Sequence, residues 1–478
     1  MLDIHQFDES VLGKETSDPL HFAFADKTSA HAAGGARPIA REQYGARLNA
    51  LYAPHHSSIL DAQAATRVKQ RCLYIHIPFC RVRCTFCNFF QNAASRQWVD
   101  EYFAALMREI EQKAALPWTQ SGVFQAVYIG GGTPTDLSPQ QVRQLGQALA
   151  ARFPLAKDCE LTLEGRINRF SDEMFDNALE GGFNRFSFGI QSFNTQVRRS
   201  AKRLDDREVV LERIGQLSAT EQAPIILDLL YGLPYQSLEV FEQDLQDYLA
   251  SGAHGIDLYQ LVVGGSAPMI NLVDKGKIPP PATTPLKADM YQLGSEFMAK
   301  HHQRPLSVNH WARDNRERSL YNSLAKTYAE VLPIGCGAGG IIAGVSMMNH
   351  RTLATYMEAM NTGQPVVAMM LEQHPLEPLF ATLKAGFDRG VISRQALESA
   401  NAQSALHSDV PRRFDFAFLQ PLFDAWQARG LATVEEDYLH LTLAGRFWSV
   451  SLAQAAIKVL QFYYQPASMS PHHVGSIA

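Results

Sequence analysis

Apolar and polar residues in the first two thirds of the chain follow two alternating periods. Short apolar runs typical of strands, such as LYIHI at 73–77 and PIILDLLYG at 224–232, precede stretches with apolar residues at every third or fourth position. In the stretch 98–112, apolar residues at 99, 102, 103, 106, 107 and 110 form one stripe of an amphipathic helix. We therefore predict alternating strands and helices from about residue 72.

Strands that alternate with helices favour right-handed βαβ units and a parallel sheet. Six strand candidates lie within about 190 residues, at 73–77, 126–132, 159–165, 185–193, 224–232 and 255–263. A TIM-like barrel, whole or partial, fits this pattern, and a doubly wound open sheet fits it equally well.

Polar and glycine residues near the carboxyl ends of these strands favour the barrel. In chain order they are a cysteine loop after the first strand, then Gly131, Gly132, Thr133, Glu164, Gln191, Asp228 and Tyr259. The carboxyl ends of parallel strands converge on one rim, where such folds keep their chemistry. We therefore expect the functional site at that rim.

Composition and net charge limit the classes of protein to which the chain can belong. A chain of 478 residues, 46% hydrophobic and 19% charged, predicts a large core domain with a smaller one attached. The formal net charge of −5 argues against non-specific nucleic-acid binding. The start MLDIHQFDES shows no secretory signal, and the six cysteines are not spaced as a disulfide framework, so we expect a cytoplasmic protein.

One uncharged segment, 331–350, is long enough to cross a bilayer. It is crowded with glycines, however, and it ends in Asn349 and His350. We interpret it as a buried glycine-rich loop and predict no membrane span.

The stretch YIHIPFCRVRCTFCNFF places Cys80, Cys84 and Cys87 on one short loop. Closed zinc and iron–sulfur sites usually take four protein ligands. A structural zinc site completed by His76 or Cys72 is one interpretation. The other is a [4Fe–4S] cluster held by the three cysteines, whose fourth iron stays open for a ligand.

The Cys-x3-Cys-x2-Cys loop, followed one unit later by GGGTP, resembles the radical S-adenosylmethionine (SAM) superfamily. The phrases YIHIPFC, GGGTPTDLS, FSFGIQSFN and LDLLYGLP look like its coproporphyrinogen dehydrogenase-like (HemN/HemW) branch, over roughly 70–350. The resemblance implies that SAM chelates the open iron and is cleaved reductively to a deoxyadenosyl radical. It also implies a partial (β/α)6 barrel over 71–350, an extension at 1–70 and a helical, winged-helix-like domain at 351–478.

Matching the family's motifs residue by residue implies a SAM site. The methionine end of SAM would meet the Gly131–Thr133 backbone, and the adenine would meet Tyr259 or Leu261. The full set of implied SAM contacts is Tyr74, Gly131, Gly132, Thr133, Glu164, Gln191, Arg203, Asp228, Tyr259, Leu261 and Gly337.

Two departures narrow the resemblance within the branch. Phe89 stands where coproporphyrinogen dehydrogenases carry a fourth cysteine, and EGRINRF replaces a proline-containing phrase after Glu164. The combination looks most like the anaerobic haem-degrading methyltransferases of the ChuW/HutW group. This implies haem as substrate, a carbon transferred from a second SAM, ring opening to an anaerobilin without O₂, and a flavodoxin or ferredoxin as low-potential electron donor. A haem chaperone and a coproporphyrinogen III dehydrogenase-like oxidase stay open as alternatives.

Three further interpretations concern single segments. Arg166, Asn168 and Arg169 are candidates for contacts to the second SAM or to haem propionates, and a plain surface loop explains them equally well. His310, in SVNHWARDN, is a candidate axial haem ligand. The acidic VEEDY at 434–438 favours a lid or a partner surface over DNA binding.

Overall fold

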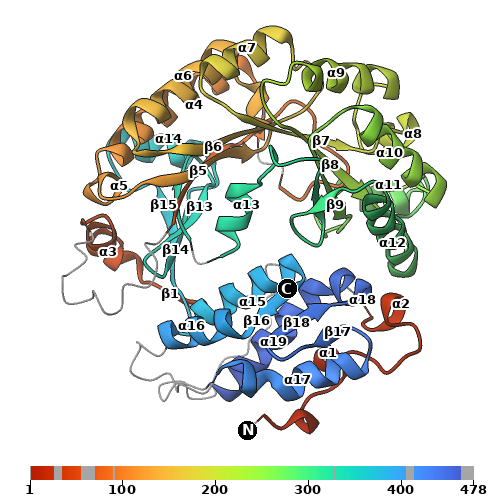
Figure 1. The fold of residues 1–478 in the computed structure, drawn as a ribbon. Coiled ribbons are helices and arrows are strands. Elements are labelled where there is room, and N and C mark those ends of the chain that lie inside the picture. Colours follow the sequence, from red (N-terminus) through yellow and green to blue (C-terminus); the bar gives the residue numbers. More distant parts are fainter. Residues whose placement is uncertain are drawn as a thin grey trace. The chain divides into compact units, whose positions relative to one another are not determined.

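The computed structural model describes residues 2–25, 35–54, 70–89, 92–327, 329–404 and 414–464 (Figure 1). The chain divides into two compact units. The barrel unit is Ala36–Gln373, and the terminal unit joins Met1–Gly35 to His374–Ala478.

Six parallel strands form the centre of the barrel unit. In both spatial and chain order they are β2 (Arg71–Ile77), β5 (Phe124–Gly131), β6 (Leu155–Gly165), β7 (Arg185–Gln191), β8 (Ile225–Tyr231) and β9 (Gly255–Gln260). The helices between them include α4 (Arg96–Ala114), α6 (Pro139–Arg152), α7 (Asp172–Glu180), α9 (Arg207–Ala219) and α10 (Leu238–Ala250). The predicted alternation and the partial βα barrel are confirmed.

Serine caps explain why several of these helices begin where they do. Ser95, Ser138 and Ser171 each accept a hydrogen bond from the third backbone amide of the helix that follows. The side chain of Gln141 also accepts a hydrogen bond from the backbone N–H of Ser138, which completes a capping box. These caps set the entry points of α4, α6 and α7 at the carboxyl end of the strands.

Within the described part of the chain, the sheet continues beyond the six central strands on both sides, to thirteen strands. Next to β2 lie, in order, β12 (Glu330–Ile334), β13 (Gly339–Ile342), β14 (Val345–Asn349), β15 (Val367–Glu372) and β1 (Arg37–Pro38). Next to β9 lie β11 (His310–Ala312) and β10 (Arg304–Pro305). Of these added strands only β12 runs parallel to its central neighbour. Both outermost strands, β1 and β10, are two-residue Arg–Pro pairs.

This extension changes two expectations from the sequence. The segment 331–350 is not a loop, because most of it pairs as β12, β13 and β14, while Gly335, Gly337 and Gly344 lie in the turns between these strands. The unit boundaries also differ from those expected at 70/71 and 350/351. Residues 351–373 belong to the barrel unit because β15 completes its sheet, and residues 1–35 group with the terminal unit.

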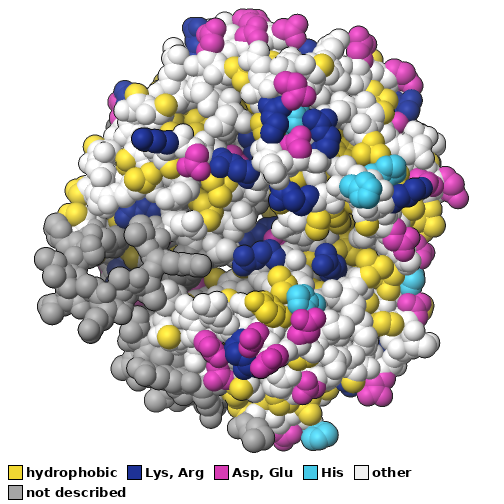
Figure 2. Space-filling model, in the orientation of Figure 1, with side chains coloured by type: hydrophobic (Ala, Val, Ile, Leu, Met, Phe, Trp, Pro, Cys, Tyr) yellow, Lys and Arg dark blue, Asp and Glu magenta, His cyan; other side chains and the backbone are white. Residues whose placement is uncertain are grey.

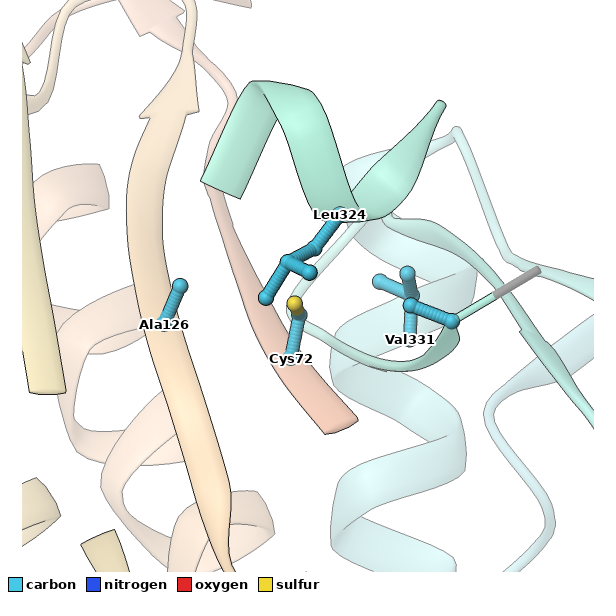
Figure 3. Packing of buried hydrophobic residues seen from close by; sticks show 5 residues of the cluster. Cys72, Ala126, Leu324 and Val331 are labelled. Carbon is cyan, nitrogen blue, oxygen red and sulfur yellow. The ribbon is translucent and has the colours of Figure 1, made fainter. Parts of the chain in front are cut away.

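The amino-terminal end of the barrel strands is closed by a short helix, α13 (Leu320–Ala325), which we call the barrel floor. Leu324 packs against Cys72 of β2, Ala126 of β5 and Val331 of β12 (Figure 3). Tyr321 of the same helix stacks on Tyr128, with ring centroids 4.9 Å apart. Apolar contacts therefore fix this end of the barrel.

A buried group of charges lies beside the floor. Arg185 of β7 donates three hydrogen bonds of 2.8–3.2 Å to the carboxylate of Glu317. His310 lies between two carboxylates, with Nδ1 2.8 Å from Asp257 and Nε2 3.1 Å from Glu317. Each buried charge faces a partner of opposite sign, as the low dielectric of a protein interior requires.

The remaining elements of the barrel unit are shorter or peripheral. They are η2 (Arg41–Gln43), α3 (Tyr44–Leu51), β3 (Phe79–Cys80), β4 (Asn92–Ala93), α5 (Pro117–Gln120), η4 (Pro134–Asp136), α8 (Thr195–Ser200), α11 (Pro268–Asp274), α12 (Thr284–Lys300) and α14 (Leu353–Thr362). Within the described residues, no helix is long and apolar enough to cross a membrane. On the face drawn in Figure 2, basic and acidic side chains are interspersed.

The terminal unit has the element order of a winged helix. It runs α15 (Glu377–Arg389), β16 (Val391–Ser393), α16 (Arg394–Ser404), α17 (Phe416–Ala428), β17 (Ala432–Val434), β18 (Tyr438–Leu441), α18 (Leu443–Phe447) and α19 (Ser449–Tyr463). The strands form one sheet, β16-β18-β17, with the acidic wing between β17 and β18. The first residues of the chain add η1 (Ile4–Gln6), α1 (Glu9–Leu12) and α2 (Pro19–Phe22), and the Trp426 indole N–H donates to Val11 O.

Candidate functional site

The three cysteines of the predicted cluster lie on the loop that leaves β2 at the carboxyl rim of the barrel. Cys80 and Cys84 are buried and Cys87 is half-buried, and all three are free thiols. The loop turns back on itself, because the Cys87 N–H donates to Cys84 O at 3.3 Å. The pairing of β3 with β4 fixes the residues that flank it.

Each of these sulfurs has a hydrogen-bond donor nearby. The Thr133 hydroxyl lies 3.4 Å from Cys80 Sγ, the Arg166 guanidinium 3.3 Å from Cys84 Sγ, and the Phe89 N–H 3.3 Å from Cys87 Sγ. Burial raises the pKa of the Cys80 thiol, and the Thr133 hydroxyl acts in the opposite direction. Donors of this kind stabilise thiolates, which are the form of cysteine that binds metal.

The described residues do not form the closed zinc site that is one interpretation of the three cysteines. In a tetrahedral zinc site with bonds of about 2.3 Å the sulfurs lie roughly 4 Å apart. Among the described residues, no three His, Cys, Asp or Glu side chains are placed to hold one ion. Cysteines bound to different irons of a cluster are spread more widely. Cys72, a candidate fourth zinc ligand, packs in the apolar floor cluster (Figure 3).

The glycine turn after β5 is required by its close approach to β2 and β3. A Cβ at Gly132 would lie 2.3 Å from the Phe79 carbonyl oxygen, and Gly131 has φ +115° with the His76 ring in the place of a side chain. The Gly132 N–H donates to Ile77 O at 2.8 Å. The turn therefore presents bare backbone beside the cysteine loop.

Tyr74 and His76 of β2 point into the same space. The Tyr74 hydroxyl lies 3.0 Å from His76 Nδ1, and burial lowers the pKa of His76 to about 4, which makes it a neutral imidazole. Glu164 ends β6 nearby. Burial raises the pKa of Glu164 to about 7, although hydrogen bonds from the Gly131 N–H and the Tyr128 hydroxyl act in the other direction.

Gln191 and Arg203 occupy unusual positions at the end of β7. Gln191 has φ +70°, a left-handed conformation that costs a non-glycine residue about 1–2 kcal/mol, and a β-bulge lies beside it. Arg203 Nε is buried and has no hydrogen-bond partner. Burial lowers the pKa of Arg203, while the thiols of Cys84 and Cys80 raise it. A buried cation with a free donor beside the cluster loop suits an anionic ligand.

Asp228 and Tyr259 continue the rim on β8 and β9. Asp228 accepts a hydrogen bond of 3.2 Å from the Ser187 hydroxyl. Burial, together with the charges of Asp257 and Glu164, raises the pKa of Asp228 above its ordinary value. Both residues are half-buried. Leu261 is set apart from them, because its side chain is buried in a separate apolar cluster.

Gly337 lies in the turn between β12 and β13 and has φ +79°. Two side chains of α4 hold this turn. Glu109 accepts the Gly335 N–H at 2.8 Å, and the Tyr102 hydroxyl donates to His76 O and accepts from the Cys336 N–H. The turn is thereby tied to the end of β2.

The sequence analysis assigns no role to the charged residues of α4 beside this turn. Glu109 and Lys113 form a buried ion pair of 2.8 Å. Their position in the sequence is the signal that could have revealed this pair. Both residues lie on the side of α4 that carries the apolar stripe of Tyr102, Leu106 and Ile110. A charged residue on an apolar face predicts a buried partner.

The interpretation of His310 as an axial haem ligand is wrong. Both ring nitrogens face carboxylates in the buried charge group. Burial by itself would lower the pKa of His310, but Asp257 and Glu317 raise it to about 9. A doubly protonated imidazole has no lone pair for iron.

Comparison with known proteins decides the family. Residues 74–248 match the family model described as the radical SAM superfamily. Anaerobilin synthase of Escherichia coli O157:H7 is 35% identical over 458 residues, which cover 94% of this chain and 97% of that protein. The chain belongs to the radical SAM superfamily.

Other relatives lie in the branch that the motifs indicated. The haem chaperone HemW of Lactococcus lactis is 29% identical over 294 residues, covering 62% of this chain and 76% of that protein. The structure of the radical SAM enzyme coproporphyrinogen III oxidase (HemN) from Escherichia coli superposes with a TM-score of 0.70. It covers 91% of this chain and 96% of its own at 20% identity, which shows a shared fold. Radical SAM proteins use a [4Fe–4S] cluster and SAM, and the expected resemblance and cofactors are confirmed.

Proposed function

We propose that this protein opens the haem ring without oxygen and adds a carbon derived from SAM. The products are a linear tetrapyrrole of the anaerobilin type and free iron. The observation that carries the proposal is the end-to-end similarity to an anaerobilin synthase, which covers both the barrel unit and most of the terminal unit. A flavodoxin or ferredoxin is the proposed electron donor.

The site residues support this proposal by their placement. Cys80, Cys84 and Cys87 hold three irons, and each sulfur has its own donor. The cluster and SAM together supply the one-electron cleavage of a sulfonium that starts radical chemistry. The free donors of Arg203 suit the SAM carboxylate, and the bare backbone at Gly131 suits its amino group.

Residues further along the rim bind the nucleoside end of SAM. Asp228 lies on β8, where a carboxylate is placed to accept ribose hydroxyls, and Tyr259 on β9 offers an aromatic face for adenine. Gly337 and Gln191 border the same rim. Leu261 acts through packing in its apolar cluster, which includes Phe86 of the cysteine loop.

Two features favour ring opening over the oxidase alternative. Phe89 stands at the position of the oxidases' fourth cysteine, is 67% exposed, and its backbone N–H donates to Cys87 Sγ. The loop after Glu164 carries Arg166 and Arg169 at a cleft beside the cluster. The second candidate function is a haem chaperone, which the HemW relative favours.

The test is anaerobic incubation of the reconstituted protein with haem, SAM and a low-potential reductant, followed by mass spectrometry. We expect an opened tetrapyrrole that carries one added carbon, and none from a Cys84→Ala variant. Intact haem that passes to an acceptor protein would select the chaperone function. Oxidation of coproporphyrinogen III side chains would select the oxidase.

A further inference from the structure

A cleft of about 640 Å³ opens directly beside the cluster loop. Its walls come from the cluster loop, from the loop after β6 and from the first turns of α4, α6 and α7. Cavities that bind a drug-sized molecule measure roughly 300–1,000 Å³, so this cleft has the size of a ligand site.

Arginines dominate the charge of the cleft. The lining includes Arg81, Arg96, Arg166 and Arg169, with Asp136 as its acidic residue. Asp136 is already paired with Arg81 at 2.9 Å. Among the described residues, no carboxylate forms an ion pair with Arg166 or Arg169. Arg166 Nη2 donates to Val82 O at 2.9 Å and lies 3.3 Å from Cys84 Sγ, so the other N–H groups of Arg166 and the guanidinium of Arg169 are available to an anionic ligand.

Arg169 has a further distinguishing feature. It is exposed and has φ +64°, although arginine has no intrinsic preference for the left-handed region. Such a conformation at a non-glycine residue is a marker of functional sites when the surrounding structure enforces it. The neighbouring Asn168 helps to fix the loop through a 2.9 Å hydrogen bond to Asp205.

Three helices point their amino ends at the same cleft. The N-caps of α4, α6 and α7, which are Ser95, Ser138 and Ser171, all line it. The positive end of each helix dipole adds to the attraction that the arginines exert on anions. The cleft is thus positive from several directions at once.

Apolar side chains form another part of the lining. Val82, Val99, Leu137, Met174 and Leu204 provide apolar surface. Thr133 and Arg166 line the cleft and also contact the sulfurs of Cys80 and Cys84, so these two side chains lie between the cleft and those sulfurs. A ligand here combines an apolar body with anionic groups and lies beside the reaction centre.

We propose that this cleft binds the propionate-bearing edge of haem, with Arg169 and Arg166 paired to the carboxylates and the apolar wall against the ring. The inference rests on the proposed function, because it assigns the place where that substrate is held. Haem has the required composition, a flat apolar macrocycle with two carboxylates on one edge. Bidentate guanidinium–carboxylate pairs would then orient the ring relative to the cluster.

The experiment compares haem with haem dimethyl ester, in which both propionates are neutral. Anaerobic titrations of the cluster-loaded protein measure both dissociation constants from the visible absorbance. We expect wild type to bind haem about tenfold more tightly than the ester. Arg169→Asn, which tolerates the left-handed backbone, removes most of that preference. The matched control is Arg108→Ala, an exposed arginine of α4 away from the cleft, which keeps the preference.

Equal affinity of wild type for haem and its ester would overturn the proposal, as would an unchanged preference in Arg169→Asn. Ring opening is scored separately by mass spectrometry, so normal turnover with no ester effect rejects the cleft and leaves the function intact. If Arg169→Asn slows turnover only with a protein reductant and not with dithionite, at unchanged haem affinity, the cleft serves the electron donor and the proposal fails. A wild type that neither binds nor opens haem overturns both.

Discussion

The two ends of the barrel use their polar groups in opposite ways. At the floor, Arg185 and His310 both contact the Glu317 carboxylate at 2.8–3.2 Å, and Tyr321 stacks on Tyr128. At the rim, Arg203 keeps a free buried donor and Gln191 keeps a strained backbone. The charged groups at the floor are paired with one another, whereas polar groups at the rim remain available to a ligand.

The titration behaviour of buried carboxylates shows the same contrast. Burial would raise the pKa of Glu317, but Arg185 and His310 lower it to about 2. At the rim, burial raises the pKa of Glu164 to about 7, because no partner of comparable strength opposes it. The paired charges at the floor therefore stabilise the fold. The buried groups at the rim that have no such partner reduce its stability and remain available to a ligand.

The largest expected effect comes from the cysteine loop. Cys84→Ala removes one of three iron ligands, so we expect loss of bound iron, sulfide and visible absorbance, and loss of turnover. The unfolding temperature of the apo protein should change little, because the floor is intact. Cys159→Ala, at a buried cysteine remote from the loop, is the matched control and should keep its cluster. Full iron content in Cys84→Ala would contradict the site.

The next effect concerns the contact between the glycine turn and the cluster loop. In Gly132→Ala the new Cβ meets the Phe79 carbonyl at 2.3 Å, so backbone must shift and the cysteine loop with it. We expect turnover to fall by about 100-fold. Gly215→Ala, where a Cβ meets nothing within 4 Å, should keep full turnover and gain up to about 1 kcal/mol. Equal turnover in both variants would show that the turn is not a positioning element.

At the floor the prediction concerns pH. The pKa of His310 rises to about 9 from an ordinary value near 6.5, so its contribution is complete below pH 6.5 and is lost as pH rises through 9. We expect the free energy of unfolding to fall by about 3 kcal/mol over that window. Urea denaturation series at several pH values measure this slope. His310→Gln should remove it, and His301→Gln, at an exposed histidine, should leave it; a slope that persists in His310→Gln would assign it elsewhere.

The smallest expected effect distinguishes backbone strain in the proposed SAM site from backbone strain beside the floor helix. Gln191→Gly relieves the left-handed backbone, so we expect about 0.5–1 kcal/mol of added stability and weaker SAM binding. Ser319→Gly, at φ +49° just before the floor helix, is the counterpart. It should add similar stability while leaving the SAM dissociation constant unchanged. Unaltered SAM binding in Gln191→Gly would remove this residue from the site.

The barrel was predictable because its signals are local. Strand and helix periods, and caps such as Ser138, are written within a few residues of each other. The family motifs likewise located Cys80, Cys84 and Cys87 at the rim. What escaped prediction depends on distant partners: the role of His310 is set by Glu317 and Asp257, which the sequence alone does not bring together.

The same reason accounts for the strands added beyond the six central ones. Glycines in 331–350 suggest a loop, but β12, β13 and β14 of this segment pair with one another, and the outer two also pair with the distant strands β2 and β15. The sequence analysis likewise assigns Glu109 no role. Its function in holding the turn at Gly335 depends on a contact 226 positions away.

The edge strands of an open sheet can pair with a strand of a second molecule, because their outer N–H and C=O groups are unpaired. The two margins here, β1 and β10, consist of Arg37–Pro38 and Arg304–Pro305. Proline offers no amide hydrogen to an incoming strand, and the guanidinium next to it resists being stripped of water. The protein thereby stops its sheet from growing between molecules, using the same two-residue signature at both ends.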